Sequence, residues 1–354
     1  MKVLFAYKYL TLGGVESVLR ARLEGLPAIG VDAHAWFLSD GPGQASFQDV
    51  RDRVHIGGLH DLQRWVDSEK PHAITSIDTE EVFPALADIA YRIPVILEIH
   101  SPYRENRAYL RWLRAIRPRA YFVPSRHQST IVAKGTAMRA PVLVVPNPLR
   151  DIFVAEPEPS CAPPPNAVVA WIGRLDAAKD WQAFLRIGRL LGKASAKVEL
   201  WMVGEAQGLA GHDRLFRKAK REQVLPRLKW YPSLAHDVVP RLLDAVVASG
   251  GVLTSTSRTE SFGMTIAEGM ARACAVVAPN EGPFPELVGD GIAGRLYRPG
   301  DEKNAAGIIA DLLSDPTQRN VLGLQARSAI LERHAPDVAL RVLADSLERV
   351  LGLG

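Results

Sequence analysis

The stretch TESFGMTIAEG, residues 259–269, carries two glutamates eight positions apart, Glu260 and Glu268. The apolar, hydroxyl-rich run GVLTSTS (251–257) precedes it and predicts a strand. A helix is predicted to begin near Ser261–Gly263, and its first N–H groups suit a phosphate or sugar hydroxyls. Glu260 would then point at a bound sugar and Glu268, two turns on, at a ribose. The spacing alone is equally met by a glutamate favoured by the helix dipole and an unrelated surface glutamate.

Further apolar strand runs alternate with helical patterns on both sides of this stretch. They are KVLFAY (2–7), DAHAWFLS (32–39), HAITSI (72–77), PVILEIH (94–100), AYFVPS (120–125), PVLVVPN (141–147), AVVAWIGRL (167–175), AKVELWMVG (196–204), RLKWYP (227–232), CAVVAPN (274–280) and AGRLYRP (293–299). Such alternation predicts parallel sheets covered by helices on both faces.

A break in this alternation divides the chain. The stretch VAEPEPSCAPPPNA (154–167) holds five prolines, so it is stiff and unhelical, and we interpret residues 154–166 as a linker. The chain is therefore predicted to form two doubly wound α/β domains that face each other across a cleft. In such folds, ligands bind at the carboxyl ends of the strands.

Bulk properties agree with a two-domain globular protein. The chain has 354 residues, is 47% hydrophobic and 23% charged, and has a net charge of +4. This charge is too small to imply nucleic acid, but it is compatible with anionic small molecules or an anionic membrane surface. The two cysteines, Cys161 and Cys274, give no disulfide framework and no zinc spacing. Without a signal peptide or a long apolar run, we expect a cytoplasmic protein.

Four other loops at predicted strand ends carry candidate ligand contacts. Gly13 and Gly14 follow the first strand and open a helix, although a plain tight turn is the better explanation of these glycines taken alone. Arg174 and Lys179, in WIGRLDAAKDW (171–181), are spaced to clamp a diphosphate, or to lie in an ordinary solvated loop. Gly204 ends another predicted strand, where it permits close approach of a ligand or merely turns the chain. His100 ends a first-domain strand, where it could orient an acceptor or a leaving phosphate.

Taken together, these motifs resemble the retaining glycosyltransferases of family 4, which have the GT-B fold. The resemblance rests on GGVE (13–16), EIHSP (98–102), VPNP (145–148), GRLDAAKD (173–180) and VGE (203–205), and on the long E-x7-E region that begins at Glu260. It covers most of the chain. It also implies a C-terminal helix, PDVALRVLADSLERVL (336–351), that crosses back to the first domain. The expected domains are thus 1–153 with 336–354, and 167–335.

The resemblance implies a nucleotide-sugar donor, UDP more often than GDP, bound mainly by the second domain. Arg174 and Lys179 would hold the diphosphate in place of a metal, so neither a metal nor another cofactor is expected. The amides of Phe262, Gly263 and Met264, with Ser261 beside them, would support the sugar and phosphate next to Glu260. Glu268 would bind the ribose, Gly13 and Gly14 would leave room for the donor, and His100 would lie near the reacting centre. The sugar would be transferred with retention of configuration.

Two features depart from the family pattern. The glycine usual after the E-x7-E helix is replaced by Cys274 or its neighbour Ala273. The turn that usually carries two glycines reads EGPFPE (281–286), with Pro283 and Pro285. Both changes lie near the expected donor sugar, so they bear on the identity of that sugar more than on the fold.

The segment SPYRENRAYLRWLRAIRPR (101–119) is rich in arginine. The helical spacing of its arginines predicts one basic face beside aromatic side chains. The residues concerned are Arg104, Arg107, Arg111, Trp112 and Arg114. This face would contact an anionic membrane at the inner leaflet, or a phosphorylated or lipid-linked acceptor. A solvated basic face with its apolar residues packed inward explains the pattern equally well.

Other functions fit the sequence less well. A GT-B epimerase would need acid and base carboxylates in the first domain, and a vitamin-B6-type phosphorylase would need its cofactor lysine and a longer chain. A non-catalytic nucleotide-sugar scaffold is disfavoured because Arg174, Lys179, Glu260 and Glu268 are all present. A dehydrogenase is disfavoured because no G-x-G-x-x-G follows a strand. The acceptor, a glycan, a lipid-linked glycan or a small metabolite, is left open.

Overall fold

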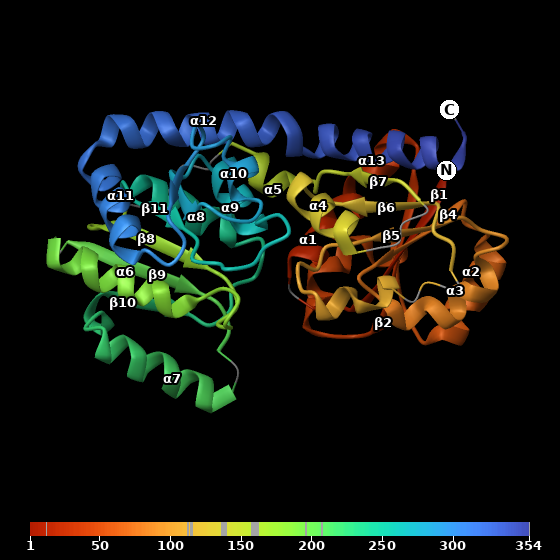
Figure 1. Cartoon of the computed structure of the whole chain (residues 1–354), viewed down its shortest axis with the longest axis horizontal. Coiled ribbons are helices and arrows are strands. Elements are labelled where there is room, and N and C mark those ends of the chain that lie inside the picture. The colour runs from red at the N-terminus through yellow and green to blue at the C-terminus, as the bar shows by residue number, and fades with distance from the viewer. Residues whose placement is uncertain are drawn as a thin grey trace. The chain divides into compact units, whose positions relative to one another are not determined.

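The computed structural model describes residues 1–11, 13–111, 113, 116–135, 140–156, 163–194, 197–206 and 208–353. The chain divides into two compact units (Figure 1). Unit 1 comprises Met1–Asp151 and Arg333–Gly354, and unit 2 comprises Ile152–Glu332. The predicted linker is described only in part, because residues 157–162, including Cys161, lie outside the described residues.

Unit 1 contains a seven-stranded parallel sheet of order β3-β2-β1-β4-β5-β6-β7. The strands are β1 (Lys2–Tyr9), β2 (Asp32–Ser39), β3 (Val54–Ile56), β4 (Ala73–Ile77), β5 (Val95–Glu98), β6 (Ala120–Val123) and β7 (Val142–Val144). All predicted strands of this unit are present. The structure adds β3, a three-residue edge strand that the sequence did not predict. Its side chains are half-buried or exposed, so its sequence contains no long apolar run.

Helices separate these strands, as the doubly wound pattern requires, and the last two of them follow the final strand. They are α1 (Gly14–Gly25), η1 (Leu26–Ile29), η2 (Pro42–Arg53), α2 (Leu59–Glu69), η3 (Glu80–Val82), α3 (Phe83–Ile89), η4 (Glu105–Arg111), α4 (Arg126–Gly135), α5 (Asp151–Val154) and α13 (Pro336–Leu351), where η marks a 3-10 helix. Side-chain alternation along β1 divides the core. Val3 and Phe5 pack on one face with Leu340 of α13, whereas Leu4 and Ala6 pack on the other.

Unit 2 contains a six-stranded parallel sheet of order β10-β9-β8-β11-β12-β13. The strands are β8 (Ala167–Ile172), β9 (Val198–Val203), β10 (Leu228–Tyr231), β11 (Val252–Thr254), β12 (Val276–Pro279) and β13 (Arg295–Tyr297). Both sheets place their first strand centrally and reverse strand order beside it, which is the topology that locates ligand sites in doubly wound folds.

The remaining helices cover this second sheet and close the chain. They are α6 (Trp181–Ala194), α7 (Gly208–Arg221), η5 (Leu225–Arg227), α8 (Val239–Ala248), α9 (Met264–Ala271), α10 (Phe284–Leu287), α11 (Glu302–Ser314) and α12 (Pro316–His334) (Figure 1). The breaks between α11 and α12 and between α12 and α13 fall at Pro316 and Pro336, because proline fits a helix start but not its interior.

The arginine-rich segment does not form the α-helix that its spacing predicted. Residues Glu105–Arg111 form the 3-10 helix η4, whose three residues per turn place side chains differently from an α-helix. Arg104 is exposed, but Arg107 turns back and donates to the carbonyls of Tyr103 and Pro102, each at 3.2 Å. Trp112 and Arg114 lie outside the described residues, as does the side chain of Arg111. The proposed uniform basic face therefore fails at Arg107.

Ala273, just after α9, has a left-handed backbone with φ of 56°. Ala273 is one of the two positions at which the resemblance implies a glycine, and a residue with a Cβ is strained in this conformation. Gly323 of α12 packs closely against the backbone at Ala273, so closely that a Cβ added to Gly323 would lie 2.2 Å from the Ala273 carbonyl oxygen. This close packing holds Ala273 in its strained conformation.

We expect Ala273→Gly to raise the free energy of unfolding by about 1 kcal/mol, because glycine adopts this conformation without strain. Urea unfolding measures the change. The control is Ala329→Gly within α12, which should lower stability by about 1 kcal/mol. A less stable Ala273→Gly variant would contradict the assigned strain.

Candidate functional site

Lys179 and Glu260 form an ion pair at the carboxyl edge of the unit 2 sheet. Lys179 follows β8 and Glu260 follows β11, and these two strands pair in parallel. Parallel pairing brings the two loops together, so side chains 81 positions apart in sequence meet through Nζ and Oε1. Both side chains are partly exposed, at 22% and 16%, so the pair is accessible to a ligand.

Hydrogen bonds fix the loop that carries Lys179 onto β11. The Thr256 hydroxyl lies 2.9 Å from the carbonyl oxygen of Lys179, and Trp171 Nε1 donates to the same hydroxyl at 2.8 Å. The backbone N–H of Arg258 donates to the carbonyl of Ala178 at 2.8 Å. The relative position of Lys179 and Glu260 therefore depends on the backbone of both loops and not only on the ion pair.

Asp176 connects the two predicted cations. Its Oδ1 accepts the backbone N–H of Lys179 at 2.9 Å, and its Oδ2 accepts Arg174 Nε at 2.9 Å. Aspartate often bonds a backbone N–H a few residues on in a turn, so the spacing D-x-x-K could have indicated this role. The Arg174 side chain is 70% exposed beside this aspartate.

Glu268 lies on α9 with most of its side chain buried. Its Oε1 lies 3.1 Å from His236 Nε2, and the His236 ring packs against Phe153 at a centroid distance of 5.0 Å. A carboxylate is an acceptor, so His236 donates from Nε2. His236 precedes α8, and sequence reasoning missed it because no local motif marks it.

Gly263 sets the entry to α9. Its φ of 94° is open to glycine but strained for other residues, and an added Cβ would lie 2.9 Å from Phe284. Gly263 is the N-cap of α9 and has no side chain that could cap the first turn of the helix. Met264, another of the predicted donor contacts, is the first residue of α9. Phe262 is buried beside Gly263. At the end of β9, Gly204 (φ 150°) approaches Gly173 so closely that an added Cβ would lie 1.8 Å from the Gly173 carbonyl oxygen.

Unit 1 holds a buried charge network at the carboxyl ends of its strands. Glu98, the last residue of β5, accepts a two-pronged contact from Arg22 of α1, with N–O distances of 2.8 and 2.6 Å. His100 Nε2 lies 2.6 Å from Glu98 Oε1. Burial disfavours the charge of Glu98, but the Arg22 guanidinium and the His100 ring outweigh it and lower the pKa of Glu98 to about 2.

Asp78, just after β4, holds the backbone of His100. Its Oδ2 accepts the His100 N–H at 3.0 Å, and its own φ of 44° is left-handed. Burial raises the pKa of Asp78 to about 6, although the nearby His100 ring favours the charged form. Sequence reasoning selected His100 but neither of its acidic partners.

Gly13 and Gly14 lie at the start of α1 in unit 1. Gly13 is the N-cap, with an extended backbone, and an added Cβ would lie 2.8 Å from Glu16 Oε2. Buried Glu16 in turn accepts the Thr11 backbone N–H at 2.9 Å. A larger residue at position 13 would therefore have to displace the Glu16 carboxylate.

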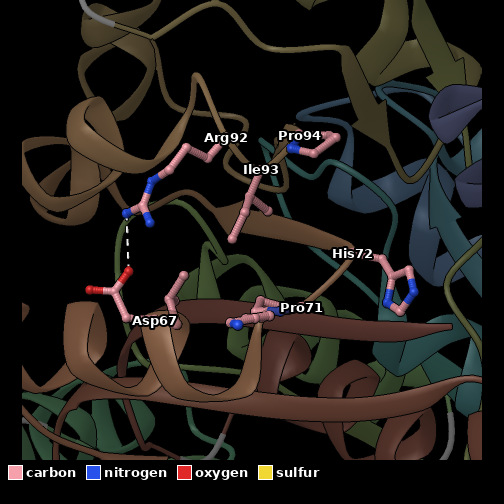
Figure 2. Close-up of a pocket in the computed structure, with 8 residues that line it drawn as sticks. Asp67, Pro71, His72, Arg92, Ile93 and Pro94 are labelled. Atoms are coloured by element: carbon pink, nitrogen blue, oxygen red, sulfur yellow. Dashed lines mark hydrogen bonds and ion pairs between the residues drawn. The ribbon is translucent and has the colours of Figure 1, made fainter.

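A pocket of about 410 Å³ lies at the opposite edge of the unit 1 sheet. Pro71 and His72 precede β4 and Pro94 precedes β5, so the pocket is at the amino ends of the strands that carry Asp78 and Glu98 at their other ends. Figure 2 shows the Arg92–Asp67 ion pair on one side of it and His72 on the other. It is separate from the network around His100.

The described part of the chain lacks both a metal-binding cluster and a membrane-spanning helix. Among those residues, no group of three or more His, Cys, Asp or Glu side chains could hold a metal ion. No helix there has the length and apolarity needed to span a bilayer.

Known proteins resemble parts of the chain in sequence. Residues 156–329 match the family model described as Glycosyl transferases group 1. The chain is 28% identical over 199 residues to D-inositol 3-phosphate glycosyltransferase of Mycolicibacterium vanbaalenii, covering 53% of this chain and 43% of that protein. It is 33% identical over 114 residues to sucrose synthase of Acidithiobacillus caldus, covering 32% and 14%. The chain spans less than half the length of these curated relatives.

Solved structures resemble the whole chain. HepE of Anabaena, in complex with UDP-glucose, aligns with a TM-score of 0.85 at 20% identity, covering 99% of this chain and 100% of that one. A glycosyltransferase from Rickettsia africae aligns with a TM-score of 0.82 at 15% identity, covering 99% and 98%. At these identities the likeness concerns the fold, and it confirms the predicted α/β class with two Rossmann-like units of the GT-B type.

We expect Asp78→Asn to stabilise the protein at neutral pH. The folded-state pKa of about 6 lies above the ordinary value of 3.8, so the folded state binds the proton more tightly. The protonated Asp78 carboxyl contributes fully to the free energy of unfolding below pH about 4. This contribution, up to about 3 kcal/mol, is lost as the pH rises through about 6. Asparagine keeps an acceptor for the His100 N–H and tolerates a positive φ.

Urea unfolding of both proteins at pH 4.5 and pH 7.5 measures this effect. The advantage of Asp78→Asn should be small at pH 4.5 and larger at pH 7.5. An advantage that does not change with pH, or a variant less stable at pH 7.5, would contradict the raised pKa of Asp78.

Proposed function

Because residues 156–329 match the family model described as Glycosyl transferases group 1, we propose that the chain is a retaining glycosyltransferase. The donor is a nucleotide-diphosphate sugar, with UDP favoured over GDP. The observation that carries the proposal is the Lys179–Glu260 pair at the carboxyl edge of the unit 2 sheet. The UDP and UDP-glucose named with HepE, a protein of the same fold, support the choice of UDP as the first nucleotide to test.

In this proposal Lys179 binds the donor diphosphate. Its ammonium has three N–H donors, and the contact with Glu260 uses one of them, so donors remain for phosphate oxygens. Arg174, exposed in the same loop, adds a planar fork that matches a phosphate. Together they would stabilise the negative charge that develops on the leaving diphosphate, which is the task a metal ion performs in other enzymes. No metal or other cofactor is therefore invoked.

Glu260 and Glu268 would each bind hydroxyl groups on a different part of the donor. A carboxylate accepts hydrogen bonds from vicinal hydroxyls. Glu260, next to Lys179, would bind the transferred sugar, and Glu268, two turns into α9, would bind the ribose. The His236 contact leaves Glu268 further acceptor capacity and orients it. The amides around Gly263 and the close approach at Gly204 complete the donor side.

Unit 1 supplies the acceptor side in this proposal. His100 would lie near the reacting centre, and Gly13 and Gly14 would make room for the donor. The acceptor is a glycan, a lipid-linked glycan or a small metabolite that presents a hydroxyl group. Contact of Arg104 and its neighbours with an anionic membrane remains part of the proposal, with the enzyme peripheral at the inner leaflet.

We expect UDP and one UDP-sugar to raise the melting temperature of the purified protein, because a ligand that binds only the folded state stabilises it. At one hundred times its dissociation constant, a ligand contributes about 2.7 kcal/mol. The shift should be the same with EDTA present. A shift abolished by EDTA would contradict the metal-free clamp, and a larger shift with GDP would contradict the nucleotide assignment.

We expect Lys179→Ala to lower the rate of UDP release from the preferred UDP-sugar by about 100-fold or more, because it removes a charge next to the leaving diphosphate. The matched control is Lys303→Ala at an exposed position of α11, which should leave the rate unchanged. Circular dichroism and the melting temperature check that each variant is folded. A folded Lys179→Ala enzyme with near-normal turnover would overturn the clamp.

A further inference from the structure

Glu98 and Arg22 form the most deeply buried ion pair among the described residues of unit 1. Arg22 is fully buried and Glu98 is 2% exposed. The guanidinium carbon of Arg22 lies 4.9 Å from the Phe5 ring centroid, which packs it further in place. A buried pair of this kind adds little net stability compared with apolar residues of similar volume, so its presence calls for a role beyond holding the fold together.

The Glu98 carboxylate of this pair also contacts the His100 ring. Glu98 Oε1, which accepts Arg22 Nη2 at 2.6 Å, also lies 2.6 Å from His100 Nε2. An ionised carboxylate can only accept, so Nε2 must carry the proton and Nδ1 is the ring nitrogen left for another partner. The backbone of His100 is held separately by Asp78 at 3.0 Å. Two acidic residues at the ends of neighbouring strands thus fix both the main chain and the ring of this histidine.

We propose that Glu98, braced by Arg22, is a positioning residue that orients the His100 imidazole through Nε2 and presents Nδ1 to the reacting groups. Glu98 touches no substrate itself and acts through His100. This inference rests on the proposed function, in which His100 lies at the reacting centre. The sequence could not show it, because Arg22 and Glu98 are separated by 76 positions.

Two double variants test the role without leaving a lone buried charge. Arg22→Met with Glu98→Leu removes the acceptor for Nε2–H and replaces the pair with apolar side chains of similar size. Arg22→Gln with Glu98→Gln removes the charges but keeps an acceptor. The control is Arg20→Gln with Glu24→Gln, a pair on the same helix with an N–O distance of 2.8 Å.

The rate is measured as UDP release from UDP-glucose, and binding as the dissociation constant for UDP. We expect the Met/Leu variant to lose about tenfold or more in rate with unchanged UDP binding, because misplaced catalytic groups cost rate more than affinity. The Gln/Gln variant and the control should stay within a few-fold of the unmodified protein. Equal losses in the Met/Leu and Gln/Gln variants would assign the effect to charge and overturn the positioning role.

A second arm places the Met/Leu change in a His100→Ala background. If Glu98 acts through His100, the change should have no further effect on the rate there. The same fold-loss in both backgrounds would show a general structural effect and overturn the proposal.

A third arm does not depend on turnover. The imidazole Nε2–H proton of His100 should give a visible signal in a proton–nitrogen NMR spectrum, because the hydrogen bond to Glu98 slows its exchange with water. The signal should vanish in His100→Ala, which assigns it, and in the Met/Leu variant. A signal that persists unchanged in the Met/Leu variant would overturn the proposal. If the unmodified protein released no nucleotide diphosphate from any nucleotide sugar, the proposed function would fail, and this signal would still decide whether Glu98 holds the His100 ring.

Discussion

Parallel pairing of β8 with β11 is the constraint on which the candidate donor site depends. Because the two strands run in the same direction, their carboxyl ends meet, and the loops that follow place Lys179 against Glu260. The Thr256 hydroxyl and the Arg258 backbone tie the same loops together. The sheet topology therefore determines where the site lies. Short loops after β8 and β11 are enough to bring its charged residues into contact.

Parallel strand pairing also brings charged residues together in unit 1, but there the charged residues contact a histidine and one ion pair is buried. There β4 and β5 pair in parallel, and their ends place Asp78 and Glu98 on either side of His100. In unit 2 the paired charges are partly exposed, whereas the Glu98–Arg22 pair is buried. Exposure suits residues that bind a ligand directly, and burial suits residues that hold another side chain in place. This contrast is why we assign Lys179 and Glu260 to the donor and Glu98 to His100.

Sequence alone predicted the α/β class and nearly all strands, because buried parallel strands are continuous apolar runs. It missed β3, which is too short to produce such a run. It also selected Lys179 and Glu260, whose motifs are local. It did not select Asp78 or His236, because their partners are distant in sequence. Glu98 lies only two residues before His100, but its burial and its pairing with Arg22, 76 positions away, appear only in the structure. The arginine spacing around Arg107 predicted an α-helix, but the backbone forms a 3-10 helix and Arg107 caps nearby carbonyls instead.

Hydrogen exchange with and without UDP-glucose tests the central claim most directly, because it reports where on the chain the donor binds. Ligand should slow exchange of backbone amides in the loops that carry Lys179 and Glu260, at residues 173–180 and 260–264, and along the first turns of α9. Amides that line the pocket around His72 and Arg92 should be unaffected. Protection confined to that pocket, or to no part of unit 2, would contradict a donor site at the carboxyl edge of the second sheet.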